Sequence, residues 1–147
     1  LQNIRYNIEN VRFLTSGMKR TDETLQLLFG AVPYAVEPRF REVDFGSFEM
    51  HSYDELKSTP AYQAWLAGDN DANVPPLGES GSQMTARVLE AFSEIEEDTC
   101  IITHGGVIAA ILEHLFPGEK DRYRWQPANG HGYAVCLTPT HREVTPL

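Results

Sequence analysis

Three side chains stand where they could bind or process an anion: Arg20, Glu42 and His104. The guanidinium of Arg20 presents a planar fork of N–H donors, which matches the oxygens of a carboxylate or a phosphate. His104 precedes two glycines, which let a ligand approach the backbone, and the start of a helix, whose amides attract anions. Glu42 lies in an aromatic segment, and a partly buried carboxyl group of this kind can act as a general acid.

Each of these residues also has an ordinary structural explanation. Taken alone, Arg20 is a surface arginine, His104 a histidine that caps a helix, and Glu42 a solvated loop carboxylate with two further acids close by. Arg87 is expected to be a charge on a helix face. The functional interpretation therefore depends on the elements that position these side chains.

Arg20 and His104 each follow a short apolar segment that predicts a buried strand, and each precedes a helix. The two strand–turn–helix units comprise a strand at 11–15 with a helix at 19–29, and a strand at 99–103, a tight turn at 104–106 and a helix at 107–116. Apolar strands that alternate with helices are typical of an α/β fold with a parallel or mixed sheet. Ligands of such sheets bind beyond the carboxyl ends of the strands, where Arg20 and His104 are expected.

The other elements follow from capping and turn signals. Capping boxes at Ser52–Glu55 and Ser80–Gln83 each predict a helix start, and Pro60 starts a helix that ends at Gly68. One face of the helix after Ser80 is expected to be buried through Met84, Val88, Phe92 and Ile95. The remaining segments are an extended piece at 33–38, a polar loop at 69–78, a last strand at 132–138, and a tail at 139–147 that is either an edge strand or loose.

Composition excludes several classes of function. The chain has 147 residues, of which 41% are apolar and 22% charged, and this predicts a single domain over residues 1–147. A formal net charge of −9 argues against a nucleic-acid partner, which requires a basic surface. No apolar run approaches the ~18 residues of a membrane span, and the first ten residues are polar, so we expect neither a membrane partner nor a signal peptide.

Metals and cofactors are not expected either. The five histidines lack the usual ligand spacings, and there is no P-loop, Rossmann fingerprint or nucleophile elbow. Cys100 and Cys136 lie in apolar segments and are expected to be buried thiols, although a disulfide between them stays open. This cysteine usage suits a reducing compartment and predicts a cytoplasmic location. The oligomeric state stays open.

Taken in order, four segments resemble motifs of the histidine phosphatase superfamily (phosphoglycerate-mutase-like, branch 1). FLTSGMKRTDET at 13–24 resembles its S-x-x-x-R-x-x-x-T segment, FREVDFGSFE at 40–49 its L-x-E-x-x-[FY]-G-x-x-E segment, PPLGES at 75–80 its P-x-G-E-S segment, and IITHGG at 101–106 its second-histidine motif. Phe40 replaces the leucine of the second motif, and Asn129 is a weaker match to a polar residue before the last core strand. The resemblance covers about residues 11–138.

The resemblance implies a three-layer, phosphoglycerate-mutase-like α/β fold with a mainly parallel sheet flanked by helices. It implies that Arg20, His104 and Gly105 bind a phosphoryl group, and that Glu42 and His104 are catalytic, with Glu42 as proton donor. The implied activity is metal-independent hydrolysis of a small phosphorylated metabolite through a phosphohistidine, without a cofactor.

One motif of the family is absent. Its R-H-G segment carries the nucleophilic histidine, and this sequence contains no Arg-His pair. The residues before Val11 are too few for that strand and the helix after it, and loss of a central strand would leave two strands without a neighbour. We therefore expect a longer natural protein whose N-terminal strand, with the nucleophile, is missing here.

Two other functions stay open. A phosphoglycerate mutase would return the phosphoryl group to its substrate, but mutases of the family usually have a longer insertion than residues 50–78, which favours a phosphatase. A domain that truly lacks the nucleophile would bind anions without turnover. Phosphorylated sugars, glycerates and nucleotide-loop intermediates are all possible substrates, and the expected specificity loops, 50–78 and 117–131, carry Tyr53, Tyr62, Trp65, Tyr123 and Trp125, most of which are expected to serve in packing.

Overall fold

The computed structural model describes residues 10–49, 52–68, 74–75 and 77–147. Most of the loop predicted at 69–78 lies outside these residues. The elements in chain order are β1 (Arg12–Thr15), α1 (Lys19–Phe29), β2 (Ala35–Val36), the 3-10 turns η1 (Pro38–Phe40) and η2 (Gly46–Phe48), α2 (Tyr53–Leu56), α3 (Pro60–Ala67), α4 (Gly81–Ser93), β3 (Thr99–Ile102), α5 (Gly105–Leu115), α6 (Arg122–Trp125), β4 (Tyr133–Leu137) and β5 (Arg142–Pro146).

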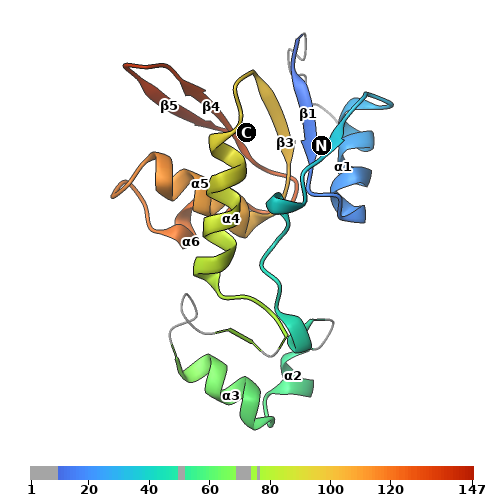
Figure 1. Cartoon of the computed structure of the whole chain (residues 1–147), viewed down its shortest axis with the longest axis vertical. Helices are drawn as coiled ribbons and strands as arrows, with labels where there is room; N and C mark the ends of the chain where they lie inside the picture. Colours follow the sequence, from blue (N-terminus) through green and yellow to red (C-terminus); the bar gives the residue numbers. More distant parts are fainter. Residues whose placement is uncertain (1–9, 50–51, 69–73, 76) are drawn as a thin grey trace.

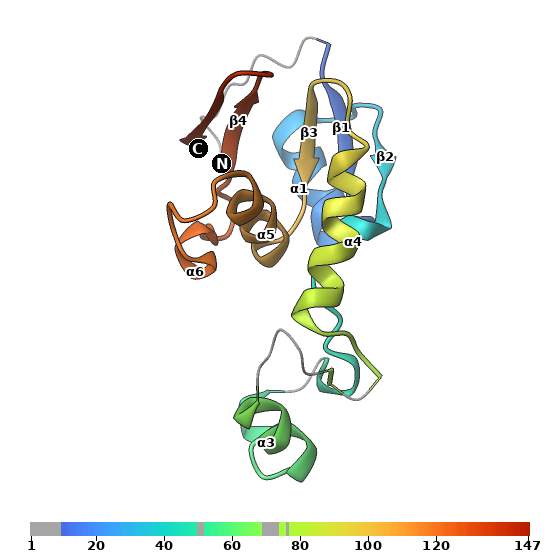
Figure 2. The same cartoon turned by 60° about the vertical axis from the view of Figure 1, so that its left-hand side comes forward.

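The sheet that carries the site is parallel, as predicted. Its strand order is β2-β1-β3, and β1 pairs in parallel with both neighbours. Successive side chains of β1 point to opposite faces. Phe13 packs on Phe29 of α1, whereas Leu14 belongs to the core formed with α4 and α5. Figures 1 and 2 show α1 and α4 on opposite sides of the sheet, which confirms the expected three-layer fold with a sheet between helices.

The apolar core lies mainly between α4, α5 and the sheet. Met84, Val88 and Ala91 of α4 are buried, and Phe92 and Ile95 pack against the same cluster, which confirms the face predicted for this helix. Six residues of α5 are buried, as expected from a helix that is apolar on nearly all sides. The helix begins at Gly105 rather than at residue 107. The turn predicted at 104–106 was wrong here, because both glycines take helical positions.

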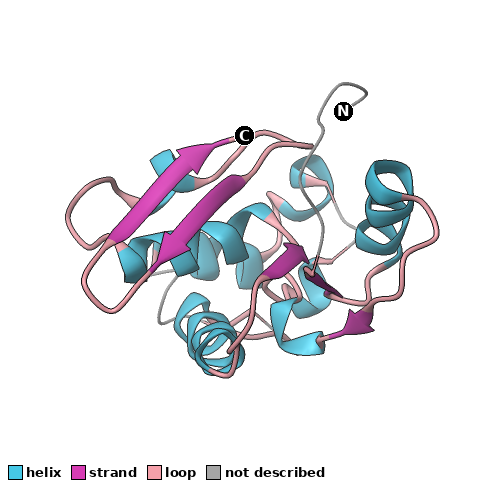
Figure 3. Ribbon diagram, turned by 90° about the horizontal axis from the view of Figure 1, so that it is seen from above, coloured by secondary structure: helices cyan, strands magenta, loops and turns pink. Residues whose placement is uncertain are grey.

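Most of the other predicted boundaries are also confirmed. Ser80 accepts a hydrogen bond of 3.1 Å from the N–H of Gln83, and the Gln83 side chain accepts one of 2.8 Å from Ser80 N–H, so this capping box is complete. The tail forms the edge strand β5, which pairs antiparallel with β4. Figure 3 shows this hairpin as a ribbon beside the parallel sheet.

The two cysteines differ from the sequence expectation. Neither forms a disulfide; Cys100 is partly buried, and burial raises the pKa of its thiol to about 11. Cys136 is exposed. The prediction of a buried Cys136 was wrong, because β4 pairs only with β5 among the described strands and keeps an exposed face. None of the helices in the described part of the chain has the length and apolar character of a membrane span.

Candidate active site

Arg20 and His104 meet at the carboxyl edge of the parallel sheet. β1 and β3 run in register from Arg12↔Thr99 to Thr15↔Ile102, so the residues that follow the two strands emerge side by side. The Nε atom and one terminal nitrogen of Arg20 lie 3.3 Å and 3.2 Å from Nδ1 of His104. A guanidinium has N–H donors and no acceptor, so Arg20 donates and Nδ1 accepts.

The surroundings of His104 oppose a positive charge on its ring. The side chain is buried, with 6% of its surface exposed. Burial lowers the pKa of His104, and the charges of Arg20, Arg41 and Arg87 lower it further, to about 4. His104 is therefore neutral at pH 7, and because Nδ1 accepts a hydrogen bond, the ring proton is on Nε2.

Two buried hydroxyl groups continue from His104 into the fold. Nε2 of His104 lies 2.8 Å from Oγ of Ser16, which lies 3.2 Å from Oγ1 of Thr21. Ser16 is the first residue after β1 and Thr21 is in the first turn of α1. From the sequence, Ser16 is a candidate only through its place after the first strand, as the serine of the S-x-x-x-R-x-x-x-T segment, and Thr21 has no predicted role. The signal for Ser16 was its place at a strand end, whereas nothing in the sequence pattern singles out Thr21.

Glu42 reaches the same edge of the sheet from a distant segment. Its carboxylate accepts hydrogen bonds from the main-chain N–H of Gly106 at 3.1 Å and from that of Val43 at 3.0 Å. A Cβ atom on Gly106 would lie 2.5 Å from Oε1 of Glu42, so a larger residue at this position would displace the Glu42 carboxyl group. The segment is also held by Thr103, whose hydroxyl donates to the carbonyl of Phe40 at 2.6 Å. The structure thus brings Arg20, Glu42 and His104 together.

Gly105 has a different neighbour from Gly106. A Cβ atom on Gly105 would lie 2.9 Å from the side chain of Gln126, which follows α6. Gly105 is the first residue of α5, and His104 is the N-cap. The Gly106 amide at this helix start donates to the Glu42 carboxylate, and the dipole of a helix start favours negative charge.

Arg87 is not the helix-face charge that we expected. Its guanidinium donates to the carbonyl oxygens of Arg39 at 2.7 Å, Arg41 at 2.7 Å and Glu42 at 3.0 Å, and pairs with the carboxylate of Glu79. Arg87 therefore holds the Glu42 segment against α4. The missed signal is its position: Met84, Arg87, Val88 and Ala91 follow the i, i+3, i+4, i+7 spacing of the buried face of α4.

Glu79, which pairs with Arg87, also holds this segment. Its carboxylate accepts from Asp44 N–H at 2.9 Å, and its own N–H donates to the carbonyl of Asp44 at 2.8 Å. A Cβ atom on Gly78 would lie 2.5 Å from that carbonyl oxygen. The G-E-S residues therefore act in the structure as a support for the segment that carries Glu42.

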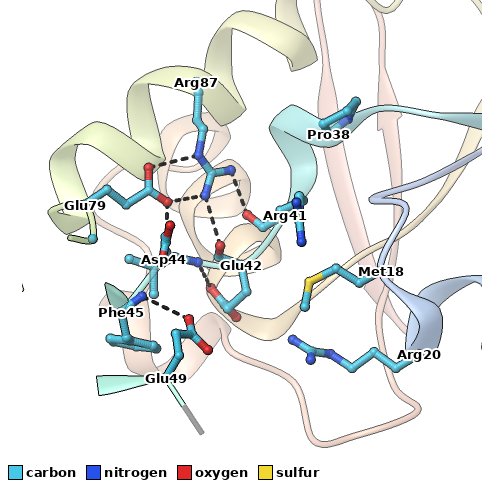
Figure 4. A pocket seen from close by; sticks show the side chains of 12 residues that line it. Met18, Arg20, Pro38, Arg41, Glu42, Asp44, Phe45, Glu49, Glu79 and Arg87 are labelled. Atoms are coloured by element: carbon cyan, nitrogen blue, oxygen red, sulfur yellow. Dashed lines mark hydrogen bonds and ion pairs between the residues drawn. The ribbon is translucent and has the colours of Figure 1, made fainter. Parts of the chain in front are cut away.

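A pocket of about 530 Å³ opens between these segments. Figure 4 shows Arg20 and Glu42 pointing into it, with Arg87 and Glu79 joined behind Glu42. The lining residues are Met18, Arg20, Pro38, Arg41, Glu42, Val43, Asp44, Phe45, Glu49, Gly78, Glu79 and Arg87. His104 is not one of them and contacts the pocket through Arg20. Arg20 and Arg41 place positive charge on one wall, opposite the acidic residues, which suits an anion with a polar organic group.

The other residues considered from the sequence lie away from this edge or pack against neighbours. Tyr62 of α3 meets Phe48 edge to face, Trp65 meets Phe48 at a tilted angle, and Trp65 also contacts the pocket residue Phe45. Trp125 is buried in the core, Tyr123 and Asn129 are exposed, and the Tyr53 side chain lies outside the described part. Among the described residues, no three His, Cys, Asp or Glu side chains form a group that could hold a metal ion.

Solved structures with this arrangement of elements are known. The alpha-ribazole phosphatase from Shigella flexneri matches with a TM-score of 0.77 at 22% identity, over 96% of this chain and 74% of that one, and at this identity the likeness shows the fold alone. A phosphoglycerate mutase from Thermus thermophilus matches with a TM-score of 0.64 at 27% identity, over 85% of this chain and 67% of that one.

Curated proteins match in sequence as well. An adenosylcobalamin/alpha-ribazole phosphatase of Salmonella typhimurium is 31% identical over 114 residues, which are 71% of this chain and 55% of that protein. A metal-independent phosphoserine phosphatase of Arabidopsis thaliana is 31% identical over 111 residues, 69% of this chain and 47% of that protein. The chain thus spans about half the length of these relatives. The family model of the histidine phosphatase superfamily (branch 1) matches residues 3–145, and the chain belongs to that superfamily.

Proposed function

We propose that this chain forms part of a metal-independent phosphatase that hydrolyses a small phosphorylated metabolite. The observation that carries the proposal is the direct contact of Arg20 with His104 at a sheet edge that Glu42 also reaches. Membership of the superfamily and the names of the two curated relatives, both phosphatases, support it.

Phosphoryl binding in this proposal depends on Arg20, His104 and Gly105. Arg20 gives the phosphoryl oxygens two parallel N–H donors, and the start of α5 adds its main-chain amides and helix dipole at Gly105. In this proposal these donors, together with the nearby pocket residue Arg41, would stabilise the negative charge that develops in the transition state. The formal net charge of −9 is no obstacle, because local arginines dominate the potential near them.

Glu42 would donate the proton to the leaving oxygen. Its two carboxyl oxygens each accept one main-chain hydrogen bond, and the clamp of Arg87 on the carbonyl of Glu42 keeps the segment in place. Each oxygen has a second lone-pair position that can carry a proton. A general acid in this position contributes a factor of about 10²–10⁴ in rate, mostly for alcohols that leave poorly.

The nucleophile in the proposal is a histidine of an Arg-His-Gly segment, which this sequence does not contain. That histidine would attack phosphorus as the bond to the leaving oxygen breaks and Glu42 protonates that oxygen. Water would then attack the phosphohistidine, release phosphate and return a proton to Glu42. Residues 1–147 would accordingly be the larger, N-terminally incomplete part of one domain, with a cytoplasmic location as the sequence predicts.

The experiment combines the intact mass of the natural polypeptide with its activity on p-nitrophenyl phosphate in EDTA. The proposal predicts a mass above 16.5 kDa, EDTA-resistant phosphate release, and a phosphoryl-protein that is stable in alkali but not in acid. A mass of 16.5 kDa with anion binding but no turnover would favour the non-catalytic domain. Isomerisation of a phosphoglycerate without phosphate release would favour the mutase, a function named for one structural neighbour.

A further inference from the structure

The hydroxyl chain behind His104 has a defined direction. Thr21 Oγ1 donates to the main-chain carbonyl of Met18 at 2.7 Å, so its single proton is used there. The bond of 3.2 Å between Ser16 and Thr21 is then donated by Ser16, and the bond of 2.8 Å between His104 and Ser16 is donated by Nε2 of His104. The contact with Arg20 indicates the same tautomer, because a guanidinium can only donate to Nδ1 and the ring proton must then be on Nε2.

The hydroxyl chain formed by Ser16 and Thr21 is buried, so a reversal of its hydrogen-bond direction costs free energy. Ser16, Thr21 and His104 have 1%, 2% and 6% of their surface exposed. If Ser16 donated to Nε2, either Thr21 would lose the carbonyl of Met18, or the oxygens of Ser16 and Thr21 would face each other without a proton between them. A buried hydrogen-bonding group that is left without a partner destabilises the fold. The proton on Nε2 is therefore retained while the ring's surroundings change.

This arrangement has a consequence for an anion that binds at Arg20. Such an anion takes up the guanidinium donors and presents an oxygen to Nδ1, which has a lone pair and no proton. Two lone pairs repel each other, and the proton of Nε2 is held by Ser16. The contact is favourable only if Nδ1 gains a second ring proton.

We propose that Ser16 and Thr21 are positioning residues that hold the ring proton of His104 on Nε2, so that binding of a tetrahedral dianion takes up one proton on Nδ1. The inference rests on the proposed anion site and extends it to the protonation of the bound state. The low pKa of His104 in the free protein, about 4, agrees with an unprotonated Nδ1.

The charged groups around the His104 ring are consistent with the uptake of a proton on Nδ1 when a dianion binds. Burial, and after it the charges of Arg20, Arg41 and Arg87, lowers the pKa of His104 in the free protein, and a dianion offsets the charges of the three arginines. Two carboxylates also face this region: Glu42 accepts from Gly106 N–H, and Asp22 accepts from the hydroxyl of Thr15 at 2.7 Å. Glu42 is the competing acceptor of the proton, and the experiment has to separate it from His104.

The experiment is a calorimetric titration with sulfate, which stays a dianion across pH 6 to 8, in buffers of different ionisation enthalpy. We expect uptake of close to one proton per sulfate at pH 6, and an affinity that falls as the pH rises, by up to about tenfold per pH unit. Nitrogen NMR of the imidazole should show a proton on Nε2 alone in the free protein and on both nitrogens in the complex. Glu42→Gln should leave the proton count unchanged.

Variants of Thr21 and Ser16 test the role of the hydroxyl chain in proton uptake. Thr21→Val removes the acceptor of the Ser16 proton, lets Ser16 donate to Nε2 and should reduce proton uptake to less than half, while Thr21→Ser keeps the hydroxyl and the full count. Ser16→Ala should act like Thr21→Val if that variant does not fold. Thr24→Val is a control, because the exposed hydroxyl of Thr24 bonds only the carbonyl of Arg20 among the described contacts.

The outcomes separate this inference from the proposed function. Sulfate binding without proton uptake, or a proton on Nδ1 in the free protein, would overturn the inference and leave the anion site intact. Unchanged uptake in both Thr21→Val and Ser16→Ala would overturn the role of the hydroxyl chain. A protein that binds neither sulfate nor phosphate would overturn the anion site of the proposed function, and this inference with it.

Discussion

The main-chain N–H of Gly106 donates a hydrogen bond of 3.1 Å to the carboxylate of Glu42, which lies 64 residues earlier in the chain. The contact joins the start of α5 to the segment between η1 and η2. It places a carboxyl group at the helix start that follows His104, and so defines the edge at which a phosphate ester would lie.

Gly106→Ala should displace Glu42, because a Cβ atom would lie 2.5 Å from Oε1. We expect slower turnover by the natural polypeptide of alkyl phosphates, which need a proton donor, with a smaller effect on p-nitrophenyl phosphate. The measurement is kcat for both substrates. Gly132→Ala is the control, since a Cβ atom there meets nothing within 4 Å. A similar loss in both variants would mean that the contact with Glu42 has no special role.

Glu42→Gln tests the role of the carboxyl group itself. The amide keeps an acceptor for Gly106 N–H but is a poor proton donor, so kcat should fall by about 10²-fold or more for alkyl phosphates and much less for p-nitrophenyl phosphate. The slope of log kcat against the pKa of the leaving group measures the difference. An equal loss for all leaving groups would rule out Glu42 as the acid.

The sequence predicts the ends of β1 and β3 well, because a short apolar run followed by polar residues and a helix is a local pattern. Arg20 and His104 were found for that reason. The roles of Arg87 and Thr21 were not found. Thr21 is linked to His104 only through Ser16, which contacts His104 in the packed fold. The spacing of α4 could have put Arg87 on the buried face, but not its partners. Arg87 reaches the carbonyl of Arg39 across 48 residues, and no local spacing reports such a contact. The exposed face of β4 was missed because it depends on which strands pair in the fold, and β4 pairs with β5 in a separate two-stranded sheet.

Arg87→Ala should destabilise the fold as well as the site. It would leave the carbonyls of Arg39, Arg41 and Glu42 without their side-chain donor, and Glu79 without its cation. We expect a loss of about 2–3 kcal/mol in the free energy of unfolding, measured by urea denaturation. Arg87→Lys should recover only part of it, because an ammonium group cannot serve four acceptors in one plane.

Arg39→Ala is the matched control for Arg87→Ala. Arg39 also contacts several acids, Glu37, Glu90 and Glu94, but two of these are largely exposed. Surface ion pairs contribute little to stability. If Arg39→Ala destabilised the fold as much as Arg87→Ala, the hydrogen bonds of Arg87 to the Glu42 segment would have no special role in stability.

The stability of the fold should depend on pH through His104. Its pKa is about 4 in the folded chain, against 6.5 for an unperturbed histidine, so the unfolded chain binds more protons between these values. The contribution of the neutral ring is complete above pH 6.5 and is lost as the pH falls to 4. On the order of 2–3 kcal/mol is involved.

The check on this dependence is urea denaturation of the wild type and His104→Asn at pH 7 and pH 4.5. Carboxylates also titrate in this range, so the quantity to compare is the difference between the two proteins. Stability should fall more steeply for the wild type. Parallel curves for the two proteins would contradict a buried neutral His104.

The most direct test of the account is the affinity for inorganic phosphate of the wild type, Arg20→Gln and Lys19→Gln. Lys19 is the neighbouring cation with the same charge, and its side chain is 89% exposed. The account predicts that Arg20→Gln weakens binding about tenfold or more, as expected for the loss of a charged donor, while Lys19→Gln changes it less than about twofold. Equal weakening by both variants would mean that phosphate responds only to net charge, and would contradict a phosphoryl-binding site built on Arg20 and His104.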